Sequence, residues 1–144
     1  MAERDYTAMN SGHRQIDHTA DLALEIWAAS EAELLLEAAR AAVAIMTENR
    51  ALEPSGEINV EIEAVDREDR LVQWVNEIIY LGVTQGFLVA SATLDLHATG
   101  LRASLRGETN AADHIAGELK SATYHDLALE ERGDGWWARL VIDV

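Results

Sequence analysis

The sequence predicts an α+β fold, in which an antiparallel or mixed sheet of about six to seven strands packs against two α-helices on one of its faces. Two segments with helical apolar spacing fall in the earlier part of the chain, and alternating apolar and polar residues dominate the later part. Helices and strands do not alternate regularly, and no G-x-G-x-x-G or Walker loop is present. The pattern therefore argues against a doubly wound nucleotide-binding fold.

The first helix is expected after two short strands, at residues 14–18 and 21–28. It is predicted to begin at Ser30, because Glu33 stands three residues later and completes a capping-box spacing. Pro54 marks the loop that follows this helix. The predicted buried stripe has helical spacing: Leu35, Ala38, Ala39, Ala42, Ile45 and Met46.

The second helix is expected after an alternating strand at residues 58–64. Asp66 is a suitable N-cap, and the helix is predicted to end near Gly82 or Gly86. Its predicted buried face consists of Leu71, Trp74, Val75, Ile78 and Ile79.

Two hairpins are predicted after the second helix. Leu94 and Leu96 lead into a turn at residues 97–100, and an alternating strand follows at residues 101–106. The last two strands are expected at about residues 118–131 and 136–144.

The last hairpin is predicted to turn at Asp134-Gly135, because both residue types tolerate a positive φ. Trp136 and Trp137 follow on the returning strand and must point to opposite faces. We therefore expect at least one of the two rings to lie off the main core unless both faces of the strand are covered. This favours an exposed aromatic patch suited to a partner.

The net charge bears directly on function. The 144 residues include 26 Asp and Glu against 11 Lys and Arg, for a formal net charge of −15, and Lys120 is the only lysine. Because nucleic-acid binding rests on Lys and Arg neutralising phosphates, strong direct binding of RNA by this chain is not expected. The acidity fits either a surface that docks a basic protein partner or an adaptation to solubility.

The length is that of one domain, which we expect at residues 13–144 after a flexible polar tail at residues 1–12. The tail has no apolar region typical of a signal peptide, and no segment approaches the roughly 18 uncharged apolar residues of a spanning helix. The chain also has no cysteine. These features predict a cytoplasmic protein that does not bind membranes.

Polar residues gather in the break between the first two expected strands. Asp17, His18 and Asp21 fall within five residues, and carboxylates offer the hard oxygen ligands that Ca²⁺ or Mg²⁺ prefers. In the structural alternative, the short polar side chains cap turn backbone and His18 packs in the core. The residues alone leave both interpretations open.

Two places near the C-terminal end also carry candidate chemistry. Asp143 and Val144 close an apolar strand pattern, where a divalent cation would offset the repulsion between the aspartate and a terminal carboxylate. An ordinary edge strand with a solvated end is the alternative. Lys120 and His125 flank a second polar segment. Lys120 is interpreted either as an anchor for an anion or as a partner of a nearby carboxylate, and His125 is more typical of a packing residue. A catalytic Ser–His–Asp triad is not supported, because no nucleophile-elbow spacing is present.

Four motifs, in this order, resemble the archease family. They are DHTAD at residues 17–21, WVNEIIY at 74–80, KSATYHDL at 120–127 and LVIDV at 140–144, and the match spans residues 13–144. The resemblance implies a small α+β protein that is not an enzyme but a cofactor of the GTP-dependent RNA ligase of tRNA splicing. That ligase joins 2′,3′-cyclic-phosphate or 3′-phosphate ends to 5′-hydroxyl ends. The resemblance implies faster guanylylation and multiple turnover of the ligase.

The resemblance also implies a metal site. It pairs Asp21 with Asp143, and Val144 contributes a main-chain or terminal oxygen. The implied ion is Ca²⁺, with Mg²⁺ or Mn²⁺ as alternatives. Asp17 stands where the family often has Glu, which makes it a weaker ligand candidate. The residues at motif positions that we name as supporting candidates are Asp17, His18, Lys120 and His125.

Two other functions are kept as alternatives. A stand-alone metal-dependent hydrolase would use the same carboxylates with His18 or His125 as general base. A general chaperone or modulator of RNA-modifying enzymes would act through exposed apolar surface.

Overall fold

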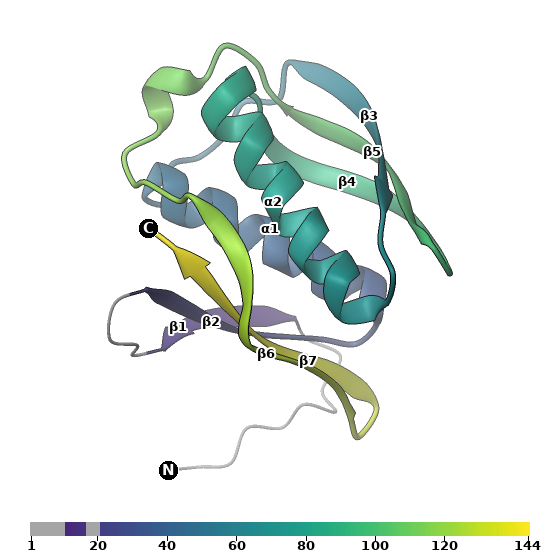
Figure 1. Cartoon of the computed structure of the whole chain (residues 1–144). Helices are drawn as coiled ribbons and strands as arrows, with labels where there is room; N and C mark the ends of the chain where they lie inside the picture. The colour runs from purple at the N-terminus through teal and green to yellow at the C-terminus, as the bar shows by residue number, and fades with distance from the viewer. Residues whose placement is uncertain (1–10, 17–20) are drawn as a thin grey trace.

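The computed structural model describes residues 11–16 and 21–144, which form seven strands and two α-helices (Figure 1). The predicted α+β class and number of strands are confirmed. Residues 1–10 of the expected tail lie outside the described residues, whereas Gly12 already belongs to the first strand. In chain order the elements are β1 (Gly12–Ile16), β2 (Leu22–Ala28), α1 (Glu31–Thr47), β3 (Gly56–Glu63), α2 (Arg67–Gln85), β4 (Leu88–His97), β5 (Gly100–Glu108), the 3₁₀ turn η1 (Ala112–His114), β6 (Ser121–Arg132) and β7 (Gly135–Asp143).

The strands form two antiparallel sheets instead of the single sheet expected from the sequence. One has the order β1-β2-β7-β6 and the other the order β3-β5-β4. Both helices contact strands of both sheets (Figure 1). In α1, ten of the 17 residues are buried, so the helix needs cover on more than one side. An apolar stripe in the sequence indicates one covered face and does not reveal the second.

Both predicted helix starts are confirmed. Ser30 Oγ accepts a hydrogen bond from the Glu33 N–H at 3.1 Å, and Asp66 Oδ1 accepts one from the Asp69 N–H at 2.8 Å. Each bond satisfies a donor that the first turn of a helix leaves unpaired. α2 ends at Gln85 and is capped by Gly86, whose φ of 64° is the left-handed conformation that favours glycine at a helix end. Across the described ranges, no helix is long and apolar enough to cross a membrane.

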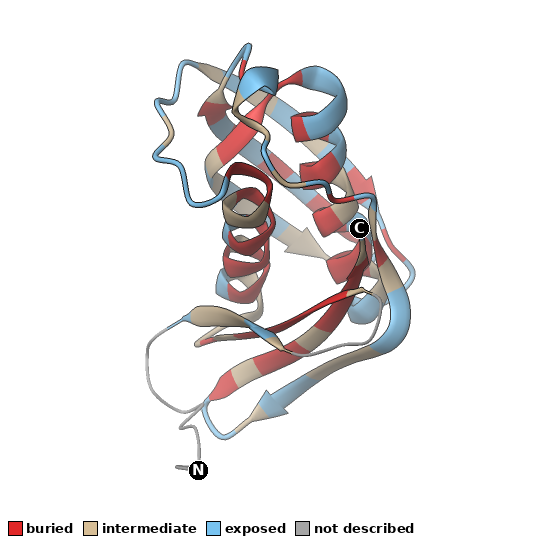
Figure 2. Cartoon of the chain, turned by 90° about the vertical axis from the view of Figure 1, so that its left-hand side faces the viewer, coloured by how far each residue is buried: buried red, intermediate tan, exposed pale blue. Residues whose placement is uncertain are grey.

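The core lies between the two sheets and includes most of the predicted helix stripes. Figure 2 shows the buried residues along both helices and along the central strands of the four-stranded sheet. Trp74 is fully buried, and its Nε1 donates to the main-chain oxygen of Leu35 at 2.6 Å, which joins the two helices. Ile45 is half-buried at the margin of the core. The predicted stripe residues that are buried are Leu35, Ala38, Ala39, Ala42, Met46, Leu71, Trp74, Val75, Ile78 and Ile79.

The final hairpin turns one residue earlier than the sequence suggests. Arg132 pairs with Gly135, so the loop residues are Gly133 and Asp134, not Asp134 and Gly135. Gly133 has a φ of 61°, and glycine at the first loop position is typical of a type II′ turn, whose twist matches the flanking strands. The preceding strand, β6, begins at Ser121, three residues later than expected.

The expected exposed aromatic patch at the tryptophan pair is wrong. Trp136 packs against the core, and the Arg67 guanidinium lies 5.1 Å from its ring centre. Trp137 faces the other side of the sheet, but only 5% of its surface is exposed. Arg132 covers its ring at 3.7 Å, and Arg139 lies 5.9 Å away. The sequence predicted that the two rings face opposite sides of the strand. It did not predict the arginines that stack on the ring of Trp137 and bury it.

Candidate functional site

Two aspartates that are far apart in the sequence lie at the same end of the four-stranded sheet. β2 and β7 are antiparallel neighbours, with Leu22 opposite Ile142. Asp21 directly precedes Leu22, and Asp143 directly follows Ile142. Each aspartate is therefore one residue beyond the same pair, on adjacent strands, and both are half-exposed.

β6 adds a third chain segment to this end of the sheet. Its first residue, Ser121, is paired with Asp143, and the N–H of Lys120 donates to the main-chain oxygen of Asp143 at 2.9 Å. The side chain of Lys120 is exposed, as is Val144. The strand pairing thus gathers Asp21, Asp143, Val144 and the backbone of Lys120 at one end of the sheet. This is the end at which β7 finishes (Figure 1).

The other supporting candidates are placed differently. Asp17 and His18 lie outside the described residues. His125 is on β6, four residues beyond Ser121 and within the irregular part of that strand. Its imidazole is exposed, and Nε2 lies 3.3 Å from Asp126 Oδ2. His125 is therefore not brought to the end of the sheet that carries Asp21 and Asp143.

The kinds of donor at this end suit a hard divalent cation. Carboxylate and main-chain oxygens are the ligands that Ca²⁺ takes in proteins. Within residues 11–16 and 21–144, no group of three or more His, Asp or Glu side chains is arranged to hold a metal ion. In the part of the chain that is described, an ion here would rely on Asp21, Asp143 and main-chain oxygens such as that of Val144.

Asn76 is a residue near this end that sequence reasoning did not select. It lies on α2, where its Oδ1 accepts from the Ala122 N–H at 2.6 Å and its Nδ2 donates to the Ala122 carbonyl at 3.3 Å. The available signal was a pair of polar residues, Asn76 and Glu77, inside the mainly apolar motif WVNEIIY. The partner of Asn76 is 46 positions away, so nothing local in the sequence indicates the contact.

A second contact joins α2 to β6 at the surface. The Tyr124 hydroxyl donates to Asp69 Oδ1 at 2.5 Å, and Gln73 Nε2 lies 3.3 Å from the same oxygen. This hydrogen bond lowers the pKa of the Asp69 carboxyl, with a further contribution from the Val65 N–H. It raises the pKa of Tyr124, because the hydroxyl proton is held by a carboxylate.

A buried acidic residue lies at the opposite side of the sheet, where α1 meets β1. Glu37 has a side chain that is 8% exposed, and its carboxylate is hydrogen-bonded to His13 Nδ1 and to Arg40 Nη1. The hydrogen bond to His13 lowers the pKa of Glu37, burial opposes this effect, and Arg40 adds to the lowering. This cluster stabilises the fold and does not reach the end of the sheet with Asp21 and Asp143.

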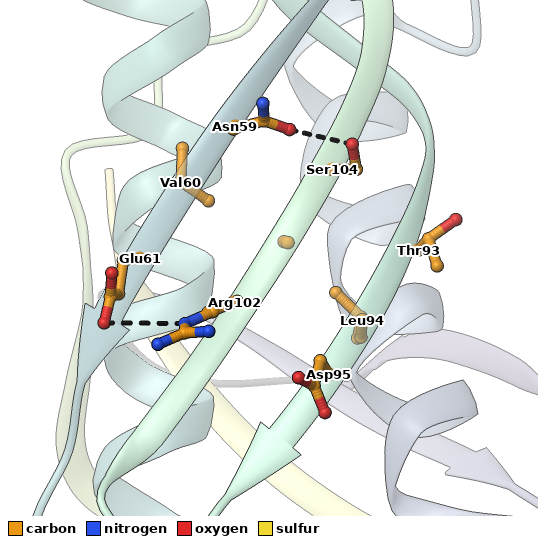
Figure 3. A pocket seen from close by; sticks show the side chains of 9 residues that line it. Asn59, Val60, Glu61, Thr93, Leu94, Asp95, Arg102 and Ser104 are labelled. Carbon is orange, nitrogen blue, oxygen red and sulfur yellow. Dashed lines mark hydrogen bonds and ion pairs between the residues drawn. The ribbon is translucent and has the colours of Figure 1, made fainter.

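A shallow hollow of about 470 Å³ lies on the other sheet, away from the paired aspartates (Figure 3). Asn59 and Ser104 are hydrogen-bonded across it at 2.8 Å, and Glu61 pairs with Arg102 at 3.7 Å. Four of its polar side chains are therefore bonded in pairs. The hollow offers no nucleophile held by a base, and we do not assign chemistry to it.

Comparison with known proteins gives the family. A profile of the archease protein family (MTH1598/TM1083) matches residues 13–144. The chain belongs to the archease family. It is 32% identical over 136 residues to protein archease of Methanopyrus kandleri, with 90% of this chain and 97% of the relative covered. It is 33% identical over 135 residues to protein archease of Archaeoglobus fulgidus, with 92% and 98% covered.

Solved structures agree with the archease fold. The crystal structure of an archease, possible chaperone, from Thermotoga maritima has a TM-score of 0.60 at 27% identity, covering 91% of this chain and 96% of its own. The solution structure of Methanobacterium thermoautotrophicum protein 1598 has a TM-score of 0.73 at 24% identity, covering 92% and 99%. The second likeness concerns the fold alone. Both likenesses extend over more than nine-tenths of this chain.

Proposed function

We propose that this archease is an accessory protein of the GTP-dependent RNA ligase of tRNA splicing, and that it promotes guanylylation and multiple turnover of the ligase. We further propose that it holds a divalent cation, Ca²⁺ in the first instance, through Asp21, Asp143 and a main-chain oxygen of Val144. Membership of the archease family supports the accessory role. It agrees with a protein that assists another one and is not itself an enzyme.

The observation that carries the proposal is the register of β2 and β7. Beyond the pair Leu22–Ile142, at the same end of the sheet, each strand carries an aspartate: Asp21 before Leu22 and Asp143 after Ile142. Two carboxylates at adjacent strand ends repel each other, and a bound divalent cation would offset that repulsion and add positive charge at this end. Asp21 and Asp143 would hold the ion, and the ladder between β2 and β7 would fix their main chains.

The net charge of −15 supports action through a protein partner. A surface this acidic repels RNA phosphates and attracts basic protein surfaces. An acidic accessory protein is therefore suited to dock on a ligase whose own surface binds RNA.

The test is a guanylylation time course of the cognate ligase with and without this protein. We expect faster guanylylation with the wild-type protein and loss of that acceleration with Asp21→Asn or Asp143→Asn. Asp134→Asn is the matched control, because Asp134 is an exposed aspartate at the opposite end of the same hairpin. Full acceleration by Asp143→Asn would exclude the carboxylate pair, and no acceleration by the wild type would exclude the accessory role.

General chaperone activity is the second candidate, because the Thermotoga maritima archease is described as a possible chaperone. It predicts that the protein suppresses heat aggregation of unrelated enzymes at equimolar concentration. The Asp143→Asn variant would suppress aggregation as well as the wild type if this activity does not use the aspartates. Acceleration confined to the ligase would argue against this candidate.

A further inference from the structure

α2 is attached to the edge of the four-stranded sheet through the side chain of Asn76. The carboxamide accepts a hydrogen bond from the Ala122 N–H and donates one to the Ala122 carbonyl. A primary amide presents an acceptor and a donor side by side, and both groups of one strand residue are satisfied here by one side chain. Asn76 thus takes the place that the backbone of a further strand would occupy beside β6.

Within the sheet, the start of β6 is paired on one side. β6 is outermost in the order β1-β2-β7-β6, so β7 is its one strand neighbour among the described strands. The ladder between β6 and β7 is interrupted between Thr123 and Ala128, where Asp126 has a φ of 53°. Ser121, Ala122 and Thr123 therefore form a three-residue ladder, separated from the longer paired stretch near the hairpin turn. Such a short ladder at an edge opens easily.

This short ladder is the part of β6 that reaches the paired aspartates. Ala122 lies between Asn76 on one side and Ile142 on the other. The next residue back, Ser121, pairs with Asp143, and the Lys120 N–H donates to the Asp143 main-chain oxygen at 2.9 Å. Displacement of Ala122 would therefore displace Lys120 and release one restraint on Asp143.

We propose that Asn76 is a positioning residue for the site at Asp21 and Asp143, acting through the backbone of residues 120–122. The identity of that site rests on the proposed function. Asn76 acts through the backbone of Ala122 and holds the β6 side of the site, while the β2–β7 ladder holds the other side. Removal of its carboxamide would loosen Lys120 and Asp143 without altering either side chain.

Two variants of Asn76 and one matched control test the inference. Asn76→Leu keeps a side chain of similar size and removes both hydrogen bonds. Asn76→Asp keeps an acceptor for the Ala122 N–H and loses the donor to its carbonyl. Tyr124→Phe is the control, because it removes a hydrogen bond between the same helix and the same strand, within the interrupted part of the ladder.

Amide hydrogen exchange by NMR and Ca²⁺ titration by calorimetry are measured on the full chain of each variant. With Asn76→Leu we expect exchange at Lys120 and Ala122 to rise about tenfold, from the loss of two hydrogen bonds, while amides of the α1–α2 core keep their wild-type rates. Ca²⁺ affinity should fall about tenfold, as for other outer contacts of metal ligands. Asn76→Asp should lie between the wild type and Asn76→Leu, and Tyr124→Phe should leave both quantities at wild-type values.

Unchanged exchange at Lys120 and Ala122 in the folded Asn76 variants would overturn the inference, and so would wild-type Ca²⁺ affinity in Asn76→Leu. If Asn76→Leu fails to fold, the same readings on Asn76→Asp decide. If the wild-type protein binds no Ca²⁺, the proposed metal site fails. The exchange rates at Lys120 and Ala122 then decide separately whether Asn76 positions this segment.

Discussion

Arg70 Nη2 lies 2.6 Å from Glu31 Oε2, and this contact joins the first turns of the two helices. The same guanidinium donates from Nη1 to the main-chain oxygens of His97 at 2.6 Å and Gly100 at 3.2 Å. Arg70 is 7% exposed, so these bonds form away from water. One buried side chain therefore connects α1, α2 and the turn between β4 and β5.

Replacing Arg70 with Met should destabilise the protein by about 3 kcal/mol. It leaves two main-chain carbonyls without their donor, and it leaves the half-buried Glu31 carboxylate with the longer ion pair to Arg67 at 3.8 Å. Urea unfolding followed by circular dichroism measures the loss. Arg102→Met is the control, since Arg102 is 67% exposed in its pair with Glu61 and should cost no more than about 1 kcal/mol. Equal losses in the two variants would contradict the connecting role of Arg70.

The buried Glu37 gives a pH-dependent contribution to stability. Its folded-state pKa lies below the usual 4.5, chiefly because of the hydrogen bond with His13, so its ionised form stabilises the fold above pH 4.5. That contribution is lost as the pH falls through the lowered pKa. Glu37→Gln should therefore cost about 2 kcal/mol near neutral pH and progressively less below pH 4.5.

Urea unfolding of Glu37→Gln and the wild type at a series of pH values checks the prediction. The exposed Glu57→Gln variant serves as the control and should show little difference from the wild type at any pH. A constant gap between the Glu37→Gln and wild-type curves down to strongly acid pH would show that the carboxylate is not the source of the stabilisation.

Tyr124 should ionise at a higher pH than an ordinary tyrosine. Its hydroxyl proton is held by the Asp69 carboxylate, which raises the pKa of Tyr124. Asp69→Asn removes that negative charge and should return the pKa of Tyr124 toward its usual range. The titration can be followed through the ring resonances of Tyr124 by NMR. Glu68→Gln, at the neighbouring exposed position, should leave the titration unchanged, and an unshifted curve in Asp69→Asn would refute the assignment.

Gly100 occupies a position that only glycine fits. Its φ is 151°, and an added Cβ would lie 1.9 Å from the main-chain oxygen of Ile62. Gly100→Ala should therefore cost about 3 kcal/mol, from strain and displacement of the β3–β5 pairing. Gly86→Ala is the graded comparison, because its Cβ would meet no atom closer than 3.4 Å and the cost should be about 1 kcal/mol. Thermal unfolding that ranks Gly86→Ala as the more damaging variant would contradict this account.

The parts of the fold that depend on neighbouring residues were predictable from the sequence. Ser30 and Asp66 cap helices through bonds to residues three positions away, so their patterns lie within one helical turn. Strand alternation likewise revealed β3 and β5. The division into two sheets was not predictable, because it depends on how much of the α1 circumference is covered by distant strands.

The candidate site could likewise be predicted from the sequence only in part. Physical reasoning from the residues alone left Asp21 and Asp143 each open between a ligand and a structural role, and the family resemblance suggested the pair. Their common placement at one end of the sheet depends on the register of β2 and β7, which no local pattern specifies. Asn76 remained hidden for the same reason, since its partner is a backbone group on another element.

The place of β7 between β2 and β6 has a consequence for the order of folding. β7 follows all the other described strands along the chain, yet it joins the β1–β2 hairpin to β6. During synthesis, the helices and the β3–β5–β4 sheet can assemble while β2 still lacks its second neighbour. Pairing between segments so distant is slow compared with local contacts. The two aspartates can therefore meet only after β7 has been synthesised and has paired with β2.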